Sequence, residues 1–399
     1  MSGSWESITA YDPLREMFTF EVNKIIFGIS AYEKLASEIL NLGGKTPVIV
    51  TDKGISDTGI VNRVKESVEK TGITVEIFDK VATEPTAESM QEAIDMIRES
   101  KSDIIVGLGG GSSMDTAKIG AVMKENEGDL LDYIGKKPFT NPRMPLILVP
   151  TTAGTGSEVT AIAVTSVGDK KRGIFDSKLF ADIALVDPLL TLSMPPKVTA
   201  STGLDALSHA IESMMTLRSN ILCDTLALQA VKLVSENLEK VFMQGKNLPA
   251  RYGMMLAATT AGITLQNALV TLPHSVGYTI AHEHHLPHGI ATVVALPYAM
   301  RFNLSLCQEK FRDVASVMGC NIEGLSLREA AIEGIKAVKK LIKDVNMPVS
   351  LKEIGVSKDH LTDLVDEFLA EYPRPFNICK VNRENLLKLY EDMWEGRIQ

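Results

Sequence analysis

The order of apolar runs along the chain is the feature that most limits its fold. Through about residue 190, short runs rich in Val and Ile alternate with stretches whose apolar residues recur every three or four positions. The runs are 47–51, 74–78, 103–106, 145–149 and 183–186, and the helical stretches include 61–70 and 86–100. This alternation predicts parallel strands joined by crossover helices, and therefore an α/β domain.

The second half of the chain has a different pattern. Strand-like runs almost vanish after Asp187, and long helical periodicities occupy 226–242, 251–265, 327–345 and 382–393. Pro188, Pro195 and Pro196 separate the two patterns, in a stretch where a helix cannot easily run. Because 399 residues exceed the usual size of a single core, we expect an α/β domain at 1–195 and an all-helical domain at 196–399.

Composition and charge exclude several classes of protein. The 50 acidic residues outnumber the 41 basic ones without a long run of either sign, which argues against nucleic acid as a partner. The four cysteines form no CxxC pair and are expected to be buried thiols in a reducing compartment. No secretory signal and no run of about 18 apolar residues is seen, so we expect a cytoplasmic protein with no membrane contact.

A glycine turn follows the third predicted strand. Gly109, Gly110 and Gly111 let the backbone approach a ligand, and a helix expected to open near Ser112 or Ser113 presents free N–H groups to it. A pyrophosphate fits such a place. The spacing departs from GxGxxG at Ser112 and no GK[ST] follows, so the residues also allow a tight turn with no ligand.

Further polar residues follow two other predicted strands. The hydroxyls of Thr151, Thr152 and Thr160 could bind ribose or phosphate, or cap their own backbone. Asp52 could accept hydrogen bonds from a ribose and repel a 2′-phosphate, which would favour NAD over NADP, or it could form a turn. Ligands of open α/β sheets bind at the carboxyl ends of strands, where all these residues lie.

Histidines are concentrated in one short segment, where five of the seven fall between residues 272 and 289. His274 is expected near the end of one helix, and His288 at the start of the next. Asp205 and His209 lie four residues apart on another predicted helix and so share one face. Three imidazoles and a carboxylate would suit Fe²⁺ or Zn²⁺ better than Mg²⁺ or Ca²⁺, although a surface pair and a solvated histidine-rich turn remain alternatives.

Taken together, these stretches resemble the iron-containing, or group III, alcohol dehydrogenases over nearly the whole chain. The resemblance is carried by Phe27-Gly28, 109–118, 150–158, the Asp205–His209 pair, and His274 fourteen residues before His288. It implies a dehydroquinate synthase-like fold, with an N-terminal α/β domain that binds NAD and a helical C-terminal domain that binds metal. The active site would lie in the cleft between them.

The resemblance also implies roles for individual residues. The metal ligands would be Asp205, His209, His274 and His288, with Fe²⁺ expected and Zn²⁺ or another divalent transition metal left open. Contacts to the nicotinamide cofactor would come from Asp52, Gly109, Gly110, Gly111, Ser112, Ser113, Asp115, Thr151, Thr152, Thr160 and Lys171. Lys171 is expected in a loop at 168–172, where its neighbours could replace it.

One position departs from the family pattern. Many members carry a second histidine four residues after the first loop ligand, and this chain has Tyr278 there. Tyr278 could donate a hydrogen bond or pack as an aromatic wall. His284, His285 or His282 could instead relay the proton, so Tyr278, His284 and His285 are the catalytic candidates.

The resulting hypothesis is a metal-dependent, NAD(H)-linked dehydrogenase of a small primary alcohol or aldehyde, active as a homodimer or larger homo-oligomer. One alternative is a dehydrogenase or transhydrogenase for short hydroxy or oxo acids. Another is an NAD- and metal-dependent lyase of the dehydroquinate synthase type, although residues 260–290 lack the basic cluster that its anionic substrate needs. A metal-binding protein without catalysis would leave the two glycine and hydroxyl loops without a purpose.

Overall fold

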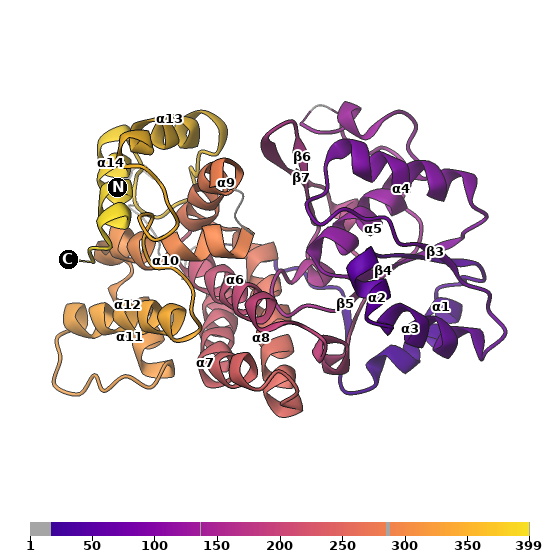
Figure 1. Ribbon diagram of the computed structural model, residues 1–399, viewed down its shortest axis with the longest axis horizontal. Helices are drawn as coiled ribbons and strands as arrows, with labels where there is room; N and C mark the ends of the chain where they lie inside the picture. Colours follow the sequence, from indigo (N-terminus) through magenta and orange to yellow (C-terminus); the bar gives the residue numbers. More distant parts are fainter. Residues whose placement is uncertain (1–16, 136, 285–287, 399) are drawn as a thin grey trace, which may run out of the picture.

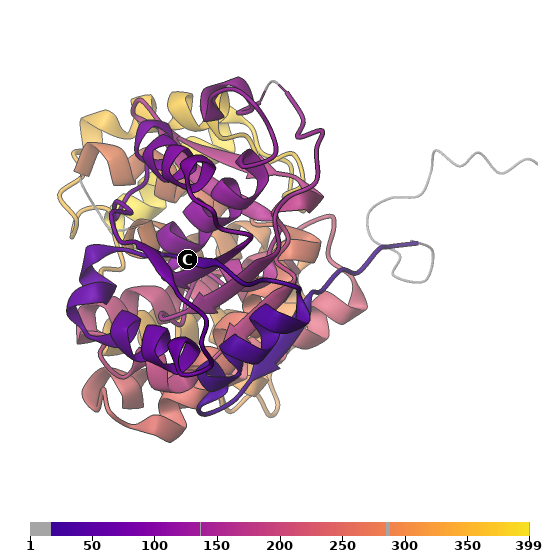
Figure 2. The ribbon, with the colours of Figure 1, turned by 90° about the vertical axis from the view of Figure 1, so that its right-hand side faces the viewer.

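The computed structural model describes residues 17–135, 137–284 and 288–398. A parallel sheet with its helices forms one half of the molecule, and the helices that follow residue 195 form the other (Figure 1). Figure 2 views the molecule from the side of the sheet and shows residues 17–23, before the first strand, extending from the body.

The sheet has six parallel strands in the order β1-β8-β5-β4-β2-β3. The strands are β1 (Lys24–Phe27), β2 (Pro47–Val50), β3 (Glu76–Phe78), β4 (Ile104–Gly109), β5 (Leu146–Pro150) and β8 (Ile183–Val186). The five strands expected from the sequence are all present. The edge strand β1 was not predicted, because it is only four residues long, begins with a lysine and is incompletely buried.

Alternate residues of each central strand pack against helices on opposite faces. Ile49 belongs to a core shared with α1 (Leu35–Asn41) and α3 (Ile60–Glu69). Val48 and Val50 instead pack with α4 (Ala87–Glu99) and α5 (Gly111–Met123). Because both faces are covered, the strands are apolar throughout, as parallel sheets require.

The chain reverses its direction of travel across the sheet between β2 and β4. From β2 it passes through α2 (Lys53–Asp57) and α3 to β3 on one side, whereas from β4 it passes through α5 to β5 on the other. The loops that leave β2 and β4 therefore diverge toward opposite faces. A crevice at the carboxyl ends of such neighbouring strands is where open α/β sheets bind ligands.

An antiparallel hairpin, β6 (Ile162–Val167) and β7 (Lys170–Phe175), lies beside the sheet. It was not predicted, and Lys171, expected in a loop, lies within β7 and pairs with Ser166. The sequence Lys-Lys-Arg-Gly carries no apolar alternation, so only pairing with β6 makes this segment a strand.

Helices make up the second half, and no strand follows β8 among the described residues, as expected. They are α6 (Pro196–Met214), α7 (Ile221–Met243), α8 (Leu248–Ala268), α9 (Leu272–His284), α10 (His288–Asn303), α11 (Gln308–Val317), α12 (Leu327–Asp344), α13 (Leu361–Glu371) and α14 (Arg383–Glu395). Short 3₁₀ helices are η2 (Ala31–Lys34), η3 (Leu130–Asp132), η4 (Ser157–Val159), η5 (Ser177–Leu179), η6 (Pro188–Thr191), η7 (Leu304–Leu306) and η8 (Lys358–His360).

Two buried helices of this half hold its centre together. From Thr199 onward nearly every residue of α6 is buried, since α7, α8 and α10 pack around it. The segment His288–Leu306 is long and apolar enough to cross a membrane, but 78% of it is buried inside the protein. That burial is what a core helix of this half would show.

Candidate active site

The glycine turn lies at the crevice between β2 and β4. Gly109 ends β4 with φ +155°, and a Cβ at this position would come within 2.5 Å of Ser113 Oγ, so only glycine fits. Helix α5 begins at Gly111, one residue earlier than expected. A Cβ at Gly110 would meet only Thr152, at 3.5 Å, which leaves open space before the first turn of the helix.

Asp52 and the loop after β5, residues 151–161, border this turn. The Asp52 carboxylate caps α2 by accepting from the Ile55 amide at 3.0 Å, and it also accepts from Ser113 Oγ at 2.9 Å. The turn-forming role considered for Asp52 is therefore present in the structure. The Thr151 amide donates to Gly109 O at 2.9 Å, while its buried hydroxyl has no hydrogen-bond partner within the described part of the chain.

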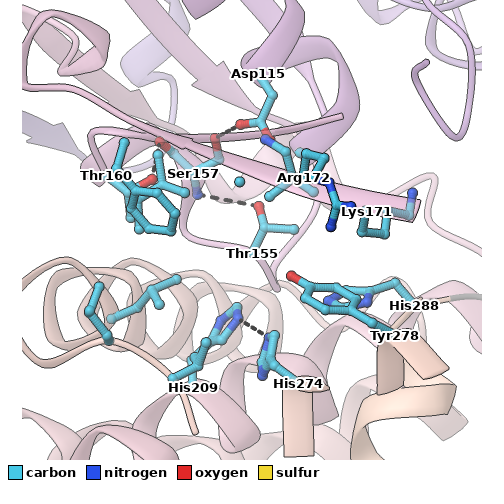
Figure 3. Close-up of a pocket in the computed structure, with 18 of the residues that line it drawn as sticks. Asp115, Thr155, Ser157, Thr160, Lys171, Arg172, His209, His274, Tyr278 and His288 are labelled. Atoms are coloured by element: carbon cyan, nitrogen blue, oxygen red, sulfur yellow. Dashed lines mark hydrogen bonds between the residues drawn. The ribbon is translucent and has the colours of Figure 1, made fainter. Parts of the chain in front are cut away.

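Lys118, for which no role was predicted, organises the loop after β5. Its fully buried Nζ donates to Ser157 Oγ at 2.6 Å and to Thr160 Oγ1 at 3.1 Å, and lies 3.4 Å from Asp115. Asp115 in turn accepts from Ser157 Oγ at 2.6 Å (Figure 3). Burial lowers the pKa of Lys118, and the Asp115 carboxylate opposes that shift. Asp115 and Thr160 thus hold the loop in shape.

Two helices bring three candidate metal ligands together. Helix α6 carries Asp205 and His209 on one face, and α9 carries His274. The two imidazole Nε2 atoms lie 3.0 Å apart, and each lies 3.9 Å from Asp205 Oδ1. Bonds of about 2.0–2.2 Å around one ion would hold its ligands roughly 3–3.5 Å apart, close to these spacings. Asp205 Oδ1 is buried and lacks a hydrogen-bond partner among the described residues, so an anionic oxygen faces the two rings.

Glu212 fixes the orientation of His274. His274 Nδ1 donates to Glu212 Oε1 at 2.7 Å, which leaves Nε2 as the nitrogen that faces the cluster. Ser208 Oγ and the Thr271 amide also donate to this carboxylate, at 2.6 and 2.8 Å. Burial would raise the pKa of Glu212, but His274 and these donors hold it below its usual value. Sequence reasoning missed Glu212, although it lies three residues after His209 and so shares its helix face.

His288 and Tyr278 extend the cluster on one side. The ring of His288 lies 5.2 Å from that of His274, and the Tyr278 ring stacks on His288 at 5.4 Å (Figure 3). Among the described residues, the group whose ligand atoms lie within 4.8 Å of one another contains Asp205, His209 and His274 but not His288. Burial lowers the pKa of His288 to about 4 and raises that of Tyr278 to about 12, so both side chains are neutral near pH 7. The side chain of His284 and the whole of His285 lie outside the described residues.

One cavity of about 430 Å³ joins the glycine turn to the histidine cluster. Its wall in the α/β half includes Gly111, Ser112, Asp115, Thr160 and Lys171, and its wall in the helical half includes Asp205, His209, His274, Tyr278 and His288 (Figure 3). Asp52, Gly109, Gly110, Ser113, Thr151 and Thr152 are not among its lining residues, although the contacts above place them beside the same turn. The fold therefore unites the two predicted sites in one cleft.

Comparison with known families identifies this arrangement. Residues 22–188 match the family of iron-containing alcohol dehydrogenases, and residues 199–394 match the C-terminal region of Fe-containing alcohol dehydrogenases. The chain belongs to the iron-containing alcohol dehydrogenases. The family membership, the fold class and the enzyme class expected from the sequence are thereby confirmed: this alcohol dehydrogenase is an NAD-linked oxidoreductase of alcohols and aldehydes.

Similar proteins cover nearly the whole length of this alcohol dehydrogenase. A sulfoacetaldehyde reductase of Bilophila wadsworthia is 35% identical over 387 residues, which span 94% of this chain and 99% of the relative. A 1,3-propanediol dehydrogenase of Klebsiella pneumoniae is 35% identical over 379 residues, spanning 94% and 98%. The solved structure of a sulfoacetaldehyde reductase from Bifidobacterium kashiwanohense in complex with NAD⁺ is 28% identical, with a TM-score of 0.85 over 95% of this chain and 99% of that one.

Proposed function

We propose that this iron-containing alcohol dehydrogenase interconverts a small primary alcohol and its aldehyde with NAD(H), using a divalent cation held by Asp205, His209, His274 and His288. The observation that carries the proposal is the bare Asp205 Oδ1, buried in the cavity wall beside two imidazole nitrogens. A buried carboxylate oxygen without a hydrogen-bond partner is costly, and a cation would remove that cost.

The donor set fits the metal that the family implies. Imidazole nitrogens with one carboxylate suit Fe²⁺, which we propose, or Zn²⁺. A cation held there would polarise the substrate oxygen and lower the pKa of the alcohol. Glu212 holds His274 in the tautomer that presents Nε2, and the neutral Tyr278 phenol can donate a hydrogen bond within the cavity. His284 and His285 stay candidates for carrying the proton to solvent.

For the cofactor, we propose NAD with its pyrophosphate at the N-terminus of α5, where free amides and the helix dipole favour an anion. The Asp52 carboxylate beside this turn would disfavour the 2′-phosphate of NADP. The contacts would come from Asp52, Gly109, Gly110, Gly111, Ser112, Ser113, Asp115, Thr151, Thr152, Thr160 and Lys171. The NAD⁺ bound by the Bifidobacterium relative supports the choice of cofactor.

The organisation of the enzyme is part of the same proposal. We place the boundary between a cofactor domain and a metal-binding domain at 195/196, just before α6. A cytoplasmic location and a homodimer or larger assembly complete it, with no role for nucleic acid or membrane.

The test is NADH absorbance with purified protein and a panel of short alcohols, before chelation, after it, and after adding back Fe²⁺ or Zn²⁺. The expected result is turnover that disappears on chelation and returns with one of the metals. In the His274→Ala variant, metal and turnover should be lost together. Turnover that survives without metal would refute the proposed chemistry, and NAD binding without net NADH formation would favour the lyase alternative.

A further inference from the structure

Three cationic side chains line one end of the cavity. The hairpin strand β7 contributes Lys171 and Arg172, and the segment after α13 contributes Arg374, while Lys170 of β7 lies outside the lining. Figure 3 shows Lys171 and Arg172 on the side of the cavity opposite Tyr278 and His288. This end of the cavity is therefore positively charged. Whether a cation there can bind an anionic ligand depends on whether a carboxylate of the protein already pairs with it.

Two carboxylates neutralise the cations of β7. Lys171 pairs with Glu84, and Glu371 receives Lys170 on one oxygen and Arg172 on the other, the latter at 2.9 Å. Each Glu371 oxygen therefore already has a cationic partner, and neither is paired with Arg374, three residues further along the chain. Among the ion pairs of the described residues, none includes Arg374.

Arg374 lines the cavity with a polar atom that lacks a partner. Its Nε is buried and makes no hydrogen bond to any residue that the structure describes. Leaving a buried guanidinium N–H without an acceptor costs free energy, and a ligand oxygen would remove that cost. Guanidinium groups also match oxyanions with two parallel N–H donors, which makes a carboxylate or sulfonate the best-fitting acceptor.

The backbone around Arg374 is held in place independently of any ligand. Ser275 Oγ donates to Tyr372 O at 2.7 Å on one side, and the Leu217 amide donates to Phe376 O at 2.8 Å on the other. Pro373 and Pro375 flank the residue and restrict its main chain. Arg374 therefore points from an anchored segment and is preorganised for an incoming anion.

Arg374 lies close to the reacting centre. Its charge acts on the phenol of Tyr278, whose ring is 5.3 Å from Tyr372 and 6.4 Å from His274. Apolar side chains of Leu265, Leu269 and Val270 line the same cavity. An anion held by Arg374 would thus lie near the metal cluster, in surroundings that strengthen its attraction to the guanidinium.

We propose that Arg374 binds an anionic group on the substrate, a carboxylate or a sulfonate joined by a short carbon chain to the alcohol or aldehyde that reacts. This inference rests on the proposed function and narrows its substrate class. The guanidinium is a specificity determinant: it anchors the far end of the substrate while the hydroxyl end faces the histidine cluster.

The experiment compares kcat/KM for hydroxypropanoate and hydroxyethanesulfonate with the values for neutral diols of the same carbon number, at fixed NAD and metal. The wild-type enzyme should prefer one of the acids, and the better acid identifies the anion. In Arg374→Gln, kcat/KM for that acid should fall by about 10- to 100-fold, while the values for the diols and the KM for NAD stay unchanged. Arg374→Lys should recover part of the loss. Arg383→Gln, which removes an exposed arginine paired with Asp366, is the matched control and should change none of these values.

Each contrary outcome has a distinct meaning. Diols used as well as the acids by the wild-type enzyme would overturn the anion proposal and leave the alcohol dehydrogenase activity standing. An equal loss for acids and diols in Arg374→Gln, or a raised KM for NAD, would overturn it too, because the guanidinium would then serve the cofactor or the fold. No NADH from either class of substrate with metal present would refute the proposed function itself.

Discussion

Glu212 illustrates how the reactivity of this site depends on a residue that no motif contains. The carboxylate accepts a hydrogen bond from His274 Nδ1 and is itself held by Ser208 and Thr271, and all four residues are buried. Glu212, which is not itself a proposed metal ligand, therefore ensures that the Nε2 lone pair of His274 faces the cluster. Residues that hydrogen-bond to metal ligands commonly affect metal affinity as well as the orientation of those ligands.

Replacing Glu212 by Gln tests this dependence. The amide keeps the shape but weakens the charge-assisted bond to His274, so we expect metal affinity to fall by about 10- to 100-fold. Competition with a chromophoric chelator measures the affinity, and KM for NAD should stay constant because Glu212 contacts His274, Ser208 and Thr271 and does not line the cavity. An unchanged affinity would mean that Glu212 serves packing alone.

At the scale of single residues, the sequence predicts which side chains act together when they share a helix face or a motif. Asp205, His209 and His274 were proposed together, and the structure brings their ligand atoms within 4.8 Å of one another. Arg374 could not be found, because the property that distinguishes it is a buried Nε without a hydrogen-bond partner among the residues that the structure describes. The ion pairs of Lys171 and of Arg172 join residues far apart in sequence, so no local pattern reports them.

Hydrophobic periodicity predicts the helices and strands of this chain wherever one face of the element, or the whole element, is buried. The apolar strands β2, β4, β5 and β8 were predictable because both faces of a parallel sheet are covered. The polar hairpin strand β7 was not, since cross-strand pairing with β6 fixes it. An element that is stabilised by pairing with a neighbouring strand, and not by burial of an apolar face, cannot be predicted from periodicity.

Asp103 joins the entrances of two neighbouring strands and gives a pH-dependent prediction. Its carboxylate accepts from the Lys45 and Thr46 amides before β2, at 3.0 and 2.8 Å. Burial would raise the pKa of Asp103, but these bonds hold it below its ordinary value of 3.8. Because the folded pKa is depressed, this stabilisation is present above the unfolded pKa and is lost as pH falls through the folded one.

In Asp103→Asn we expect a loss of about 1 kcal/mol in the free energy of unfolding at pH 7. The difference from wild type should shrink as pH is lowered through and below 3.8. Denaturant unfolding across this range measures it. Asp57→Asn, an exposed partner of Lys53, is the control and should cost less than about 0.5 kcal/mol. A difference that is constant with pH would contradict the assigned cause.

At the scale of the whole molecule, the two halves meet at close backbone contact. A Cβ at Gly262 of α8 would lie 2.7 Å from Gly156 Cα and 2.8 Å from Val159, in the loop after β5. The sequence predicted two regions of different pattern and the cleft between them. It could not predict how they pack, because that packing depends on such contacts between distant glycines.

Gly262→Ala should therefore destabilise the enzyme by about 1–3 kcal/mol, as overpacking of a buried contact does. Thermal unfolding measures the change. Glu236→Ala, exposed on α7, is the control and should stay within about 0.5 kcal/mol of wild type. Unchanged stability in Gly262→Ala would show that the halves shift apart without cost.

The most direct test of the account is stoichiometric return of metal to chelated enzyme, with bound metal and NADH formation followed in the same titration. The account predicts that turnover rises in proportion to occupancy and reaches its plateau at one ion per chain, with no recovery in Asp205→Ala. Full turnover before any ion binds, or a plateau unrelated to occupancy, would contradict the assignment of Asp205, His209 and His274 to a catalytic metal site.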